Sequence, residues 1–253
     1  VVFLLTLVIG IQLVKNIFEI ELANEQKSEL MSFATHEIRT PITVIRGYAT
    51  MLLDGDRGNV TPEIKDLLQK IMISGNDVIT LLTQYLDKSK IELGQVDYIL
   101  TRFDLVPIVN EILSTFQIHS EQKGLNLTKV LDAKHPHIIY ADQAKIKEVI
   151  TNVIDNSIKY TPKGGIEVSL SSSDGYSTIK VADTGVGINP ETIQFLFKEF
   201  SRSDLKKVNL LGTGIGLYLA KKFTEGHKGK IWAESEGEGK GAQFYVRLPE
   251  AGR

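Results

Sequence analysis

The sequence predicts an α+β protein of more than one domain: an N-terminal antiparallel helical hairpin followed by an α/β sandwich. Up to about residue 94, glycine occurs only at punctuating places and apolar residues recur at helical spacing. Beyond that point, short β-rich runs alternate with helical stretches and glycine-rich loops; the runs are GLNLTKVL, GIEVSLSSS, STIKVAD, KIWAES and AQFYVRL. The 253 residues, of which 42% are hydrophobic, suffice for two modest cores, because domains commonly have about 100–150 residues.

Charge and cysteine content exclude several classes of function. The formal net charge of −2 provides no basic surface of the kind that nucleic-acid binders use to neutralise phosphates, so we expect no nucleic-acid partner. The chain has no cysteine and therefore forms neither disulfides nor thiolate metal sites, which fits a reducing cytosol.

The opening residues, VVFLLTLVIGIQLV, are the one strongly apolar run, but the run stops at Lys15, short of the ~20 residues that cross a bilayer. Because the sequence begins inside the run, residues 1–27 fit the end of a truncated transmembrane helix with Lys15 on the inner side. Gln12 within the run favours the alternative, a coiled-coil signalling helix. The first reading predicts membrane attachment of the parent protein, with this chain as a cytoplasmic domain of an inner-membrane protein.

The hairpin turn is predicted in the stretch DGDRGNVTPE. Thr61 suits a helix N-cap and Pro62 the first helical position, so a second helix begins there. It runs to about Leu93, and Gly94 provides a stop. These boundaries give a hairpin domain at 28–94 and a mixed α/β domain at 102–250.

His36 lies on the first helix, nearly opposite an apolar face. That face consists of Leu30, Met31, Ala34, Ile38, Pro41, Ile42, Ile45, Ala49 and Leu52. Glu37 adjoins His36, and Thr40 follows one turn later on the exposed side. An exposed neutral imidazole attacks phosphorus while a neighbouring carboxylate holds the proton of its other nitrogen. Pro41 removes a backbone donor and predicts a kink or a loosened turn near His36.

A second polar face is predicted on the helix that follows residue 142. Its apolar side is formed by Ile146, Val149, Ile150, Val153 and Ile154, and its polar side by Glu148, Asn152, Asn156 and Lys159. Two asparagines one turn apart are poor helix formers, but their amide oxygens suit a hard cation such as Mg²⁺ that bridges phosphates.

Two glycine loops follow. Asp183 ends a predicted strand before Gly185 and Gly187, where a carboxylate accepts from an adenine amino group and glycines let the base approach the backbone. The second loop places glycines immediately before an amphipathic helix, whose N-terminus attracts phosphate: Gly212, Gly214 and Gly216. The spacing G-T-G-I-G is not a dinucleotide-binding fingerprint, and the chain has no P-loop motif.

The segment SFATHEIRTPITVIRGYATMLLDG resembles the phosphoacceptor box of the sensor histidine kinases. The downstream segments, taken in order, resemble the N, D-x-G-x-G, F and G-x-G-x-G boxes of their catalytic domain. The resemblance spans about 28–250. It implies a dimeric four-helix bundle built from the hairpin, followed by the ATP-binding fold shared with DNA gyrase, heat-shock ATPase chaperones and mismatch-repair ATPases.

The resemblance also implies the function. His36 would be autophosphorylated from Mg-ATP with the help of Glu37, and the phosphoryl group would pass to an aspartate of a response regulator. Thr40 would help position water when the same domain dephosphorylates that regulator.

Roles in the ATP site are likewise implied position by position. Asn152 and Asn156 would hold magnesium and phosphate, Lys159 and Tyr160 would flank the nucleotide, and Asp183 would recognise adenine in a pocket shaped by Gly185 and Gly187. Arg202 would neutralise charge near the terminal phosphate, and Gly212, Gly214 and Gly216 would hinge a lid at residues 201–211. Ser157 stands where the family more often has alanine.

Three questions stay open at this level. Apolar stripes on both helices favour a homodimer, but whether phosphorylation occurs within or between its chains depends on the handedness of the hairpin. A clamping ATPase of the gyrase or chaperone type is the first rival to a kinase, and the THEIRTP helix disfavours it. A response-regulator phosphatase without kinase activity is the second.

Overall fold

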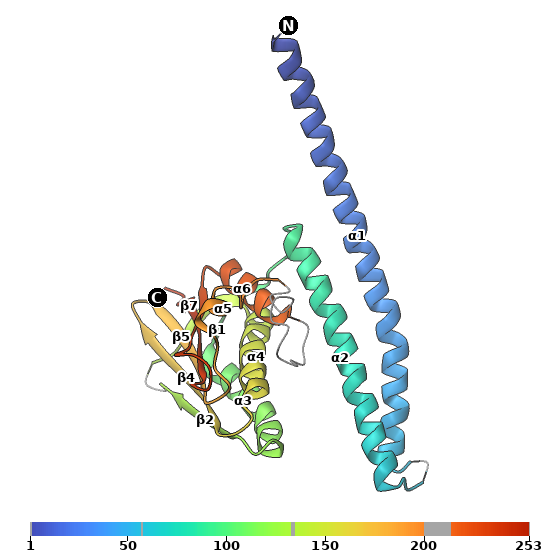
Figure 1. Ribbon diagram of the computed structural model, residues 1–253, viewed down its shortest axis with the longest axis vertical. Helices are drawn as coiled ribbons and strands as arrows, with labels where there is room; N and C mark the ends of the chain where they lie inside the picture. The colour runs from blue at the N-terminus through green and yellow to red at the C-terminus, as the bar shows by residue number, and fades with distance from the viewer. Residues whose placement is uncertain (1, 57, 133–134, 200–213, 253) are drawn as a thin grey trace. The chain divides into compact units, whose positions relative to one another are not determined.

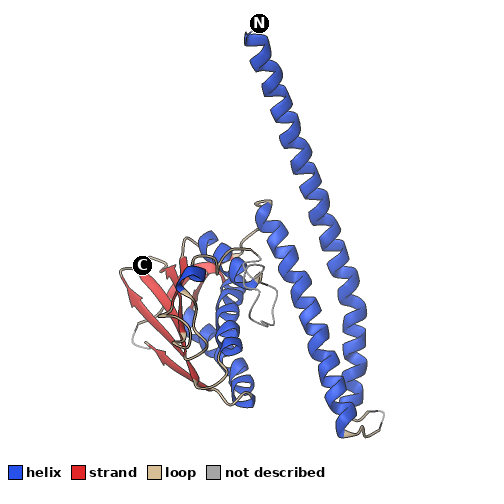
Figure 2. Ribbon diagram, in the orientation of Figure 1, coloured by secondary structure: helices blue, strands red, loops and turns tan. Residues whose placement is uncertain are grey.

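The computed structural model describes residues 2–56, 58–132, 135–199 and 214–252. They form two compact units, Val1–Val96 and Asp97–Arg253. Figure 2 shows that the first unit is helical and that the second combines helices with strands, as the sequence predicted.

The first unit is a hairpin of two helices, α1 (Val2–Leu53) and α2 (Pro62–Glu92), which lie side by side (Figure 1). Helix α2 begins as predicted, with the Thr61 side chain accepting a hydrogen bond from the amide of Ile64 at 3.4 Å. Pro62 occupies the first turn, where a backbone N–H has no helical partner. Gly94 follows the C-cap with φ +65°, a conformation that favours glycine.

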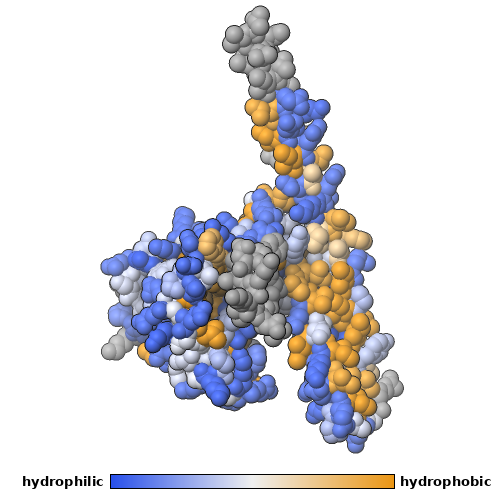
Figure 3. Space-filling view, in the orientation of Figure 1, coloured by the Kyte–Doolittle hydropathy of each residue, from blue (hydrophilic) through white to orange (hydrophobic). Residues whose placement is uncertain are grey.

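The two helices approach closely at Gly75 of α2. A Cβ atom there would lie 3.2 Å from Cγ2 of Ile42 on α1, so a larger residue would require the Ile42 side chain to shift. Ala49 of α1 and Leu68 of α2 are buried. Much other apolar surface on both helices is exposed, as the orange areas of Figure 3 show: Leu30, Ile38, Ile45, Ile64, Leu67, Ile71, Ile73, Val78 and Leu81.

The second unit contains a five-stranded sheet in the order β2-β4-β5-β7-β6 and a two-stranded sheet, β1-β3. Strand β2 pairs with β4 in parallel, and the other pairs are antiparallel. The strands are β1 (Leu100–Asp104), β2 (Asn126–Leu131), β3 (Ile138–Asp142), β4 (Gly165–Ser173), β5 (Tyr176–Asp183), β6 (Lys230–Glu234) and β7 (Ala242–Pro249). The helices are α3 (Leu105–Gln122), α4 (Gln143–Tyr160), the short α5 (Pro190–Ile193) and α6 (Gly216–Gly226).

One face of the large sheet is covered by α3, α4 and α6 (Figure 2). Alternate strand residues point into this core, which gives β4 and β5 their alternating burial. Helix α4 contributes the predicted apolar side in full: Ile146, Val149, Ile150, Val153 and Ile154 are each at most 1% exposed. Burying one such side chain contributes about 1.5–3 kcal/mol, so α4 is held firmly against the sheet.

The five strands of the large sheet all lie in runs that the sequence predicted, whereas β1 and β3 were not predicted. Each of these two strands has only five residues, and their pairing joins segments that are distant in sequence. The opening apolar run belongs to α1. In the part of the chain that the structure describes, no helix combines the length and the apolar content that crossing a membrane requires.

A buried histidine ties the last strand's end to the rest of the second unit. The Nδ1 atom of His137 lies 2.9 Å from the Ser177 hydroxyl, which donates to Oε1 of Glu250 at 2.7 Å. Burial acts to raise the pKa of Glu250, but the serine hydrogen bonds and the positive potential of His137 and His135 outweigh it. The pKa of Glu250 therefore lies below its ordinary value.

Because this pKa is lowered on folding, Glu250 contributes stability above its unfolded pKa and loses it as the pH falls through the folded pKa. We expect Glu250→Gln to lower the free energy of unfolding at pH 7 by roughly 1 kcal/mol. The substitution replaces a charge-assisted hydrogen bond with a weaker neutral one, and the partial exposure of the site keeps the loss small. The difference from wild type should shrink in acid. Urea unfolding at a series of pH values measures it, with the exposed loop residue Glu236→Gln as control. A difference that is constant down to strongly acidic pH would contradict the assignment.

Candidate functional site

His36 projects from α1 into solvent. Its side chain is 77% exposed, and Nδ1 lies 3.4 Å from Oε1 of Glu37. At this distance the carboxylate can accept a hydrogen bond from Nδ1, and in the tautomer that makes this bond Nε2 is unprotonated. The exposure of His36 and its position beside Glu37 agree with the sequence pattern, while its role as a nucleophile stays a prediction.

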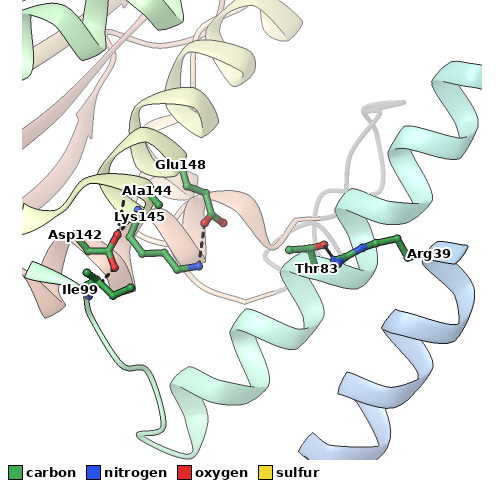
Figure 4. Close-up of polar contacts among 7 residues, drawn as sticks. All are labelled: Arg39, Thr83, Ile99, Asp142, Ala144, Lys145 and Glu148. Carbon is green, nitrogen blue, oxygen red and sulfur yellow. Dashed lines mark hydrogen bonds and ion pairs between the residues drawn. The ribbon is translucent and has the colours of Figure 1, made fainter. Parts of the chain in front are cut away.

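The helix around His36 runs on without interruption through Pro41. The predicted loosening therefore does not break α1. The Thr40 hydroxyl donates to the carbonyl of His36 at 3.2 Å, and Thr43 does the same to Arg39 at 2.8 Å. Arg39 in turn donates to the Thr83 hydroxyl of α2 at 3.4 Å, as drawn in Figure 4. These contacts attach the turn that carries His36 to the second helix.

The second unit carries the asparagines on the half-buried side of α4. The Asn156 amide nitrogen donates to the backbone carbonyl of Asn152 at 2.7 Å, which leaves its amide oxygen for a ligand. The amide nitrogen of Asn152 is buried and has no hydrogen-bond partner among the described residues. An unpaired buried amide costs about 1–3 kcal/mol unless a ligand accepts its hydrogen bond. A phosphate oxygen could accept from this nitrogen, and the amide oxygen of Asn156 could bind Mg²⁺, so this side of α4 fits a phosphate–magnesium group.

A metal site can also be formed by protein side chains alone. Within the described ranges, no three His, Cys, Asp or Glu side chains gather as candidate ligands.

Asp183 lies at the end of β5, and its Oδ1 accepts hydrogen bonds from the amides of Gly185 at 2.9 Å and Ala242 at 3.1 Å. Burial raises the pKa of Asp183 above its ordinary value, although these amides and the nearby Ser157 hydroxyl act against the shift. The backbone donors occupy Oδ1, which leaves the second oxygen for a donor on a ligand. The geometry suits recognition of an amino group such as that of adenine.

The loop after Asp183 can follow its path only with glycines. A Cβ atom on Gly185 would lie 2.4 Å from the carbonyl oxygen of Tyr160. A Cβ on Gly187, where φ is +70°, would lie 2.0 Å from the carbonyl of Gly237. Both contacts are closer than van der Waals packing allows, so these glycines are required by backbone approach.

Lys159 and Tyr160 form the last turn of α4 and are half-buried. The carbonyl of Tyr160 accepts from the amide of Val186 at 3.1 Å, which joins the end of α4 to the loop after Asp183. Ser157, the departure from the family pattern, is 1% exposed and therefore fits the space of an alanine. Its hydroxyl lies near Asp183 but makes no hydrogen bond of good geometry within the described residues.

Gly214, with φ +74°, precedes α6, and Gly216 is the first residue of that helix. The N-cap residue Ile215 makes no side-chain hydrogen bond to the first turn of α6, and the N-terminus of a helix attracts anions. Arg202, Gly212 and the predicted lid at residues 201–211 lie outside the described residues.

Within the second unit, the structure brings together the end of α4 and the loop after β5, which are separate in sequence. It adds a residue pair that the sequence reasoning missed. Gly241 immediately precedes β7, and Ala242 is its first residue. The amide of Ala242 donates to Asp183, and a Cβ on Gly241 would lie 2.0 Å from the Asp183 carbonyl oxygen. The glycine-rich stretch GEGKG before β7 was the available signal.

Comparisons with known proteins match both units. Residues 26–94 match the family model described as "His Kinase A (phospho-acceptor) domain". Residues 141–252 match the family described as "Histidine kinase-, DNA gyrase B-, and HSP90-like ATPase".

Two curated relatives are similar over most of the chain. Hybrid signal transduction histidine kinase B of Dictyostelium discoideum is 34% identical over 235 residues, and histidine protein kinase DivJ of Caulobacter vibrioides is 30% identical over 224 residues. The matches cover 90% and 88% of this chain but only 12% and 37% of the relatives, so the chain spans less than two fifths of either.

Solved structures share the fold. The full-length ShkA structure in complex with AMPPNP has a TM-score of 0.71 at 23% identity, covering 89% of this chain and 46% of that one. Histidine kinase ThkA, solved in complex with the response regulator protein TrrA, has a TM-score of 0.59 at 25% identity, covering 88% and 61%. The predicted fold class is therefore confirmed.

The raised pKa of Asp183 generates a prediction. We expect Asp183→Asn to weaken ATP binding about 10- to 100-fold, because an amide accepts less strongly than a carboxylate. In the wild type, ATP affinity should fall with decreasing pH, beginning at a higher pH than for an ordinary aspartate, and the variant should lack this dependence. Calorimetric titration with ATP measures both. Asp174→Asn, at the exposed β4–β5 turn, is the matched control, and tight binding by Asp183→Asn would refute the role.

Proposed function

We propose, from the premise that this chain belongs to the sensor histidine kinases, that it transfers the terminal phosphoryl group of ATP to Nε2 of His36. The observation that carries the proposal is an exposed imidazole, held at Nδ1 by Glu37, in a chain whose second unit belongs to the ATPase family. The curated relatives are histidine kinases as well.

The tautomer of His36 with its proton on Nδ1 determines that Nε2 is the attacking atom. The Nε2 lone pair forms the N–P bond while the bond between the terminal phosphorus and the bridging oxygen breaks, and ADP leaves with that electron pair. The Nδ1 proton stays on the ring, where Glu37 stabilises the positive charge that develops. The acidic partner is therefore more useful during transfer than before it.

The ATP roles rest on the contacts of the second unit. The free oxygen of Asp183 accepts from adenine, and the asparagine oxygens of α4 hold Mg²⁺, which when bound neutralises phosphate charge. Lys159 and Tyr160 flank the nucleotide, and Gly214 and Gly216 lie at the start of α6, where the positive end of the helix attracts phosphate. Arg202 and Gly212 keep their inferred roles at the terminal phosphate and lid hinge.

A variant of the acceptor tests the kinase directly. His36→Gln should abolish incorporation of label from γ-labelled ATP, because the amide has no nucleophilic nitrogen lone pair. His119→Gln, on the exposed side of α3, should label as the wild type does. The wild-type label should be acid-labile, base-stable and dependent on Mg²⁺. Undiminished labelling of His36→Gln would refute the proposal, and ATP hydrolysis without any labelling would favour the clamping ATPase.

We also propose that the hairpin is one half of a homodimeric four-helix bundle. Both helices expose large apolar side chains that the single hairpin cannot cover, among them Leu67 and Ile73 of α2 at 58% and 59%. Pairing with a second hairpin buries such apolar stripes. The bundle then consists of α1 and α2 from each of the two chains. Whether the ATP of one chain serves its own His36 or that of its partner follows from the connection at 54–61.

The proposed downstream partner is a response regulator receiver domain. The ThkA relative was solved in complex with a response regulator. We propose that this chain passes its phosphoryl group to an aspartate of such a protein and also hydrolyses the product. Thr40 supports the phosphatase activity, because its exposed hydroxyl lies one helical turn from His36. To orient a water molecule, the hydroxyl has to give up only its hydrogen bond to the His36 carbonyl.

The two activities should separate at Thr40. We expect Thr40→Ala to keep the autophosphorylation rate within about twofold but to lower dephosphorylation of the phosphorylated regulator roughly tenfold or more. Thr43→Ala is the matched control, because Thr43 makes the same backbone contact one turn later. Equal phosphatase rates in the wild type and Thr40→Ala would contradict this role.

A further inference from the structure

Asp142 is a buried carboxylate that serves two segments at once. As N-cap of α4, its Oδ1 accepts from the amides of Ala144 at 3.0 Å and Lys145 at 3.1 Å. Its Oδ2 accepts from the amide of Ile99 at 2.9 Å, in the segment that leads from α2 into β1. Figure 4 draws the three bonds converging on the one side chain.

The backbone of Asp142 is held as well. Its amide donates to Nε2 of His227 at 2.9 Å, and Nδ1 of His227 donates to the carbonyl of Phe223 at 2.7 Å, so the ring carries its proton on Nδ1. The ring of Tyr98 packs edge-on against His227 with 4.6 Å between centroids. Residue 226 is glycine, and a Cβ there would lie 2.3 Å from the Tyr98 hydroxyl. We call Tyr98, Ile99, Asp142 and His227 the Asp142 clamp.

The clamp lies far from the ATP-binding residues along both helices. Asn152 follows Asp142 by ten residues, which is about 15 Å along α4. His227 ends α6, whereas the glycine loop precedes the opposite end of that helix. The clamp therefore does not belong to the nucleotide site.

The clamp determines how much chain is free between the units. Helix α2 ends at Glu92, and the amides of Leu93, Gly94 and Gln95 still donate to carbonyls of its last turn. Tyr98 and Ile99 are held by the clamp, so the free tether is residues 96–97. Two extended residues span at most about 7 Å, whereas release of the clamp frees residues 96–99, which span about 14 Å. The volume that the tethered ATP site can reach then grows about eightfold, since it scales with the cube of this length.

We infer that Asp142 is a positioning residue for phosphoryl transfer, which fastens Ile99 to the start of α4 and so keeps the tether short. The inference rests on the proposed kinase function. A short tether raises the effective concentration of the ATP terminal phosphate at His36 without touching either group.

The carboxylate is suited to this double task. Burial acts to raise the pKa of Asp142, but the amides of Ile99, Lys145 and Ala144 outweigh it, so the pKa lies below its ordinary value and the group stays ionised. An asparagine has a single oxygen. It can therefore accept from the first amides of α4 or from the amide of Ile99, but not from both. Its NH₂ group then faces the remaining backbone N–H, and two donors form no hydrogen bond.

The test compares Asp142→Asn with Asp104→Asn in the full chain. Asp104 caps α3 by accepting from the amide of Val106 at 3.0 Å, and within the described part of the chain it makes no hydrogen bond to residues 93–99. The same substitution there therefore tests the loss of a helix cap alone. We expect Asp142→Asn to keep the ATP dissociation constant within about twofold, to lower the labelling rate at saturating ATP at least about threefold, and to release the Ile99 amide to hydrogen exchange. Asp104→Asn should leave all three unchanged.

A second variant guards against misfolding. Ile99→Pro removes the amide donor at a residue whose side chain is 76% exposed, while Asp142 keeps its cap of α4, and it should reproduce the loss in rate. Unchanged protection of Ile99 in Asp142→Asn, a normal labelling rate with the amide released, or a loss of ATP affinity matching the loss in rate would each overturn the inference. If the wild type itself fails to label, the kinase proposal fails, while exchange at Ile99 still reports the clamp.

Discussion

Helix α4 must bury one side completely while it keeps amide groups half-buried on the other. Its five predicted apolar residues are at most 1% exposed, which holds the helix against the sheet. The same packing holds Asn156 and the unpaired amide of Asn152 in place, because neither can swing into water without moving the helix. The energy of the core therefore maintains a polar surface that would be unfavourable without a ligand.

The loop after β5 depends on this helix in turn. The carbonyl of Tyr160 receives the amide of Val186, and Gly185 passes so near that carbonyl that no side chain fits. Asp183 is then fixed by amides from two directions, its own loop and the start of β7. The position of the carboxylate is thus fixed, and one of its oxygens is already hydrogen-bonded. It can discriminate between ligands by the group that reaches its other oxygen.

The first unit follows the opposite principle. Its helices expose apolar side chains, and His36 is 77% exposed. In the proposed function a second hairpin covers these side chains and the ATPase domain supplies the nucleotide. The proposed role of the Asp142 clamp concerns that domain, because the clamp would limit the length of chain that tethers it.

Local patterns were enough to determine much of this protein from sequence. The start of α2 at Thr61 and Pro62, the five strands of the large sheet, and the buried side of α4 all arise from capping and periodicity within a few residues. His36, Glu37 and Asp183 were predicted as site residues for the same reason, because each lies in a short recognisable motif. Only the tertiary structure decided the pairing of β1 with β3, the amide of Ala242 on Asp183 and the bond from Ile99 to Asp142, since each joins residues separated by dozens of positions. A periodic pattern reports which side of an element is buried, but not which distant backbone will meet it.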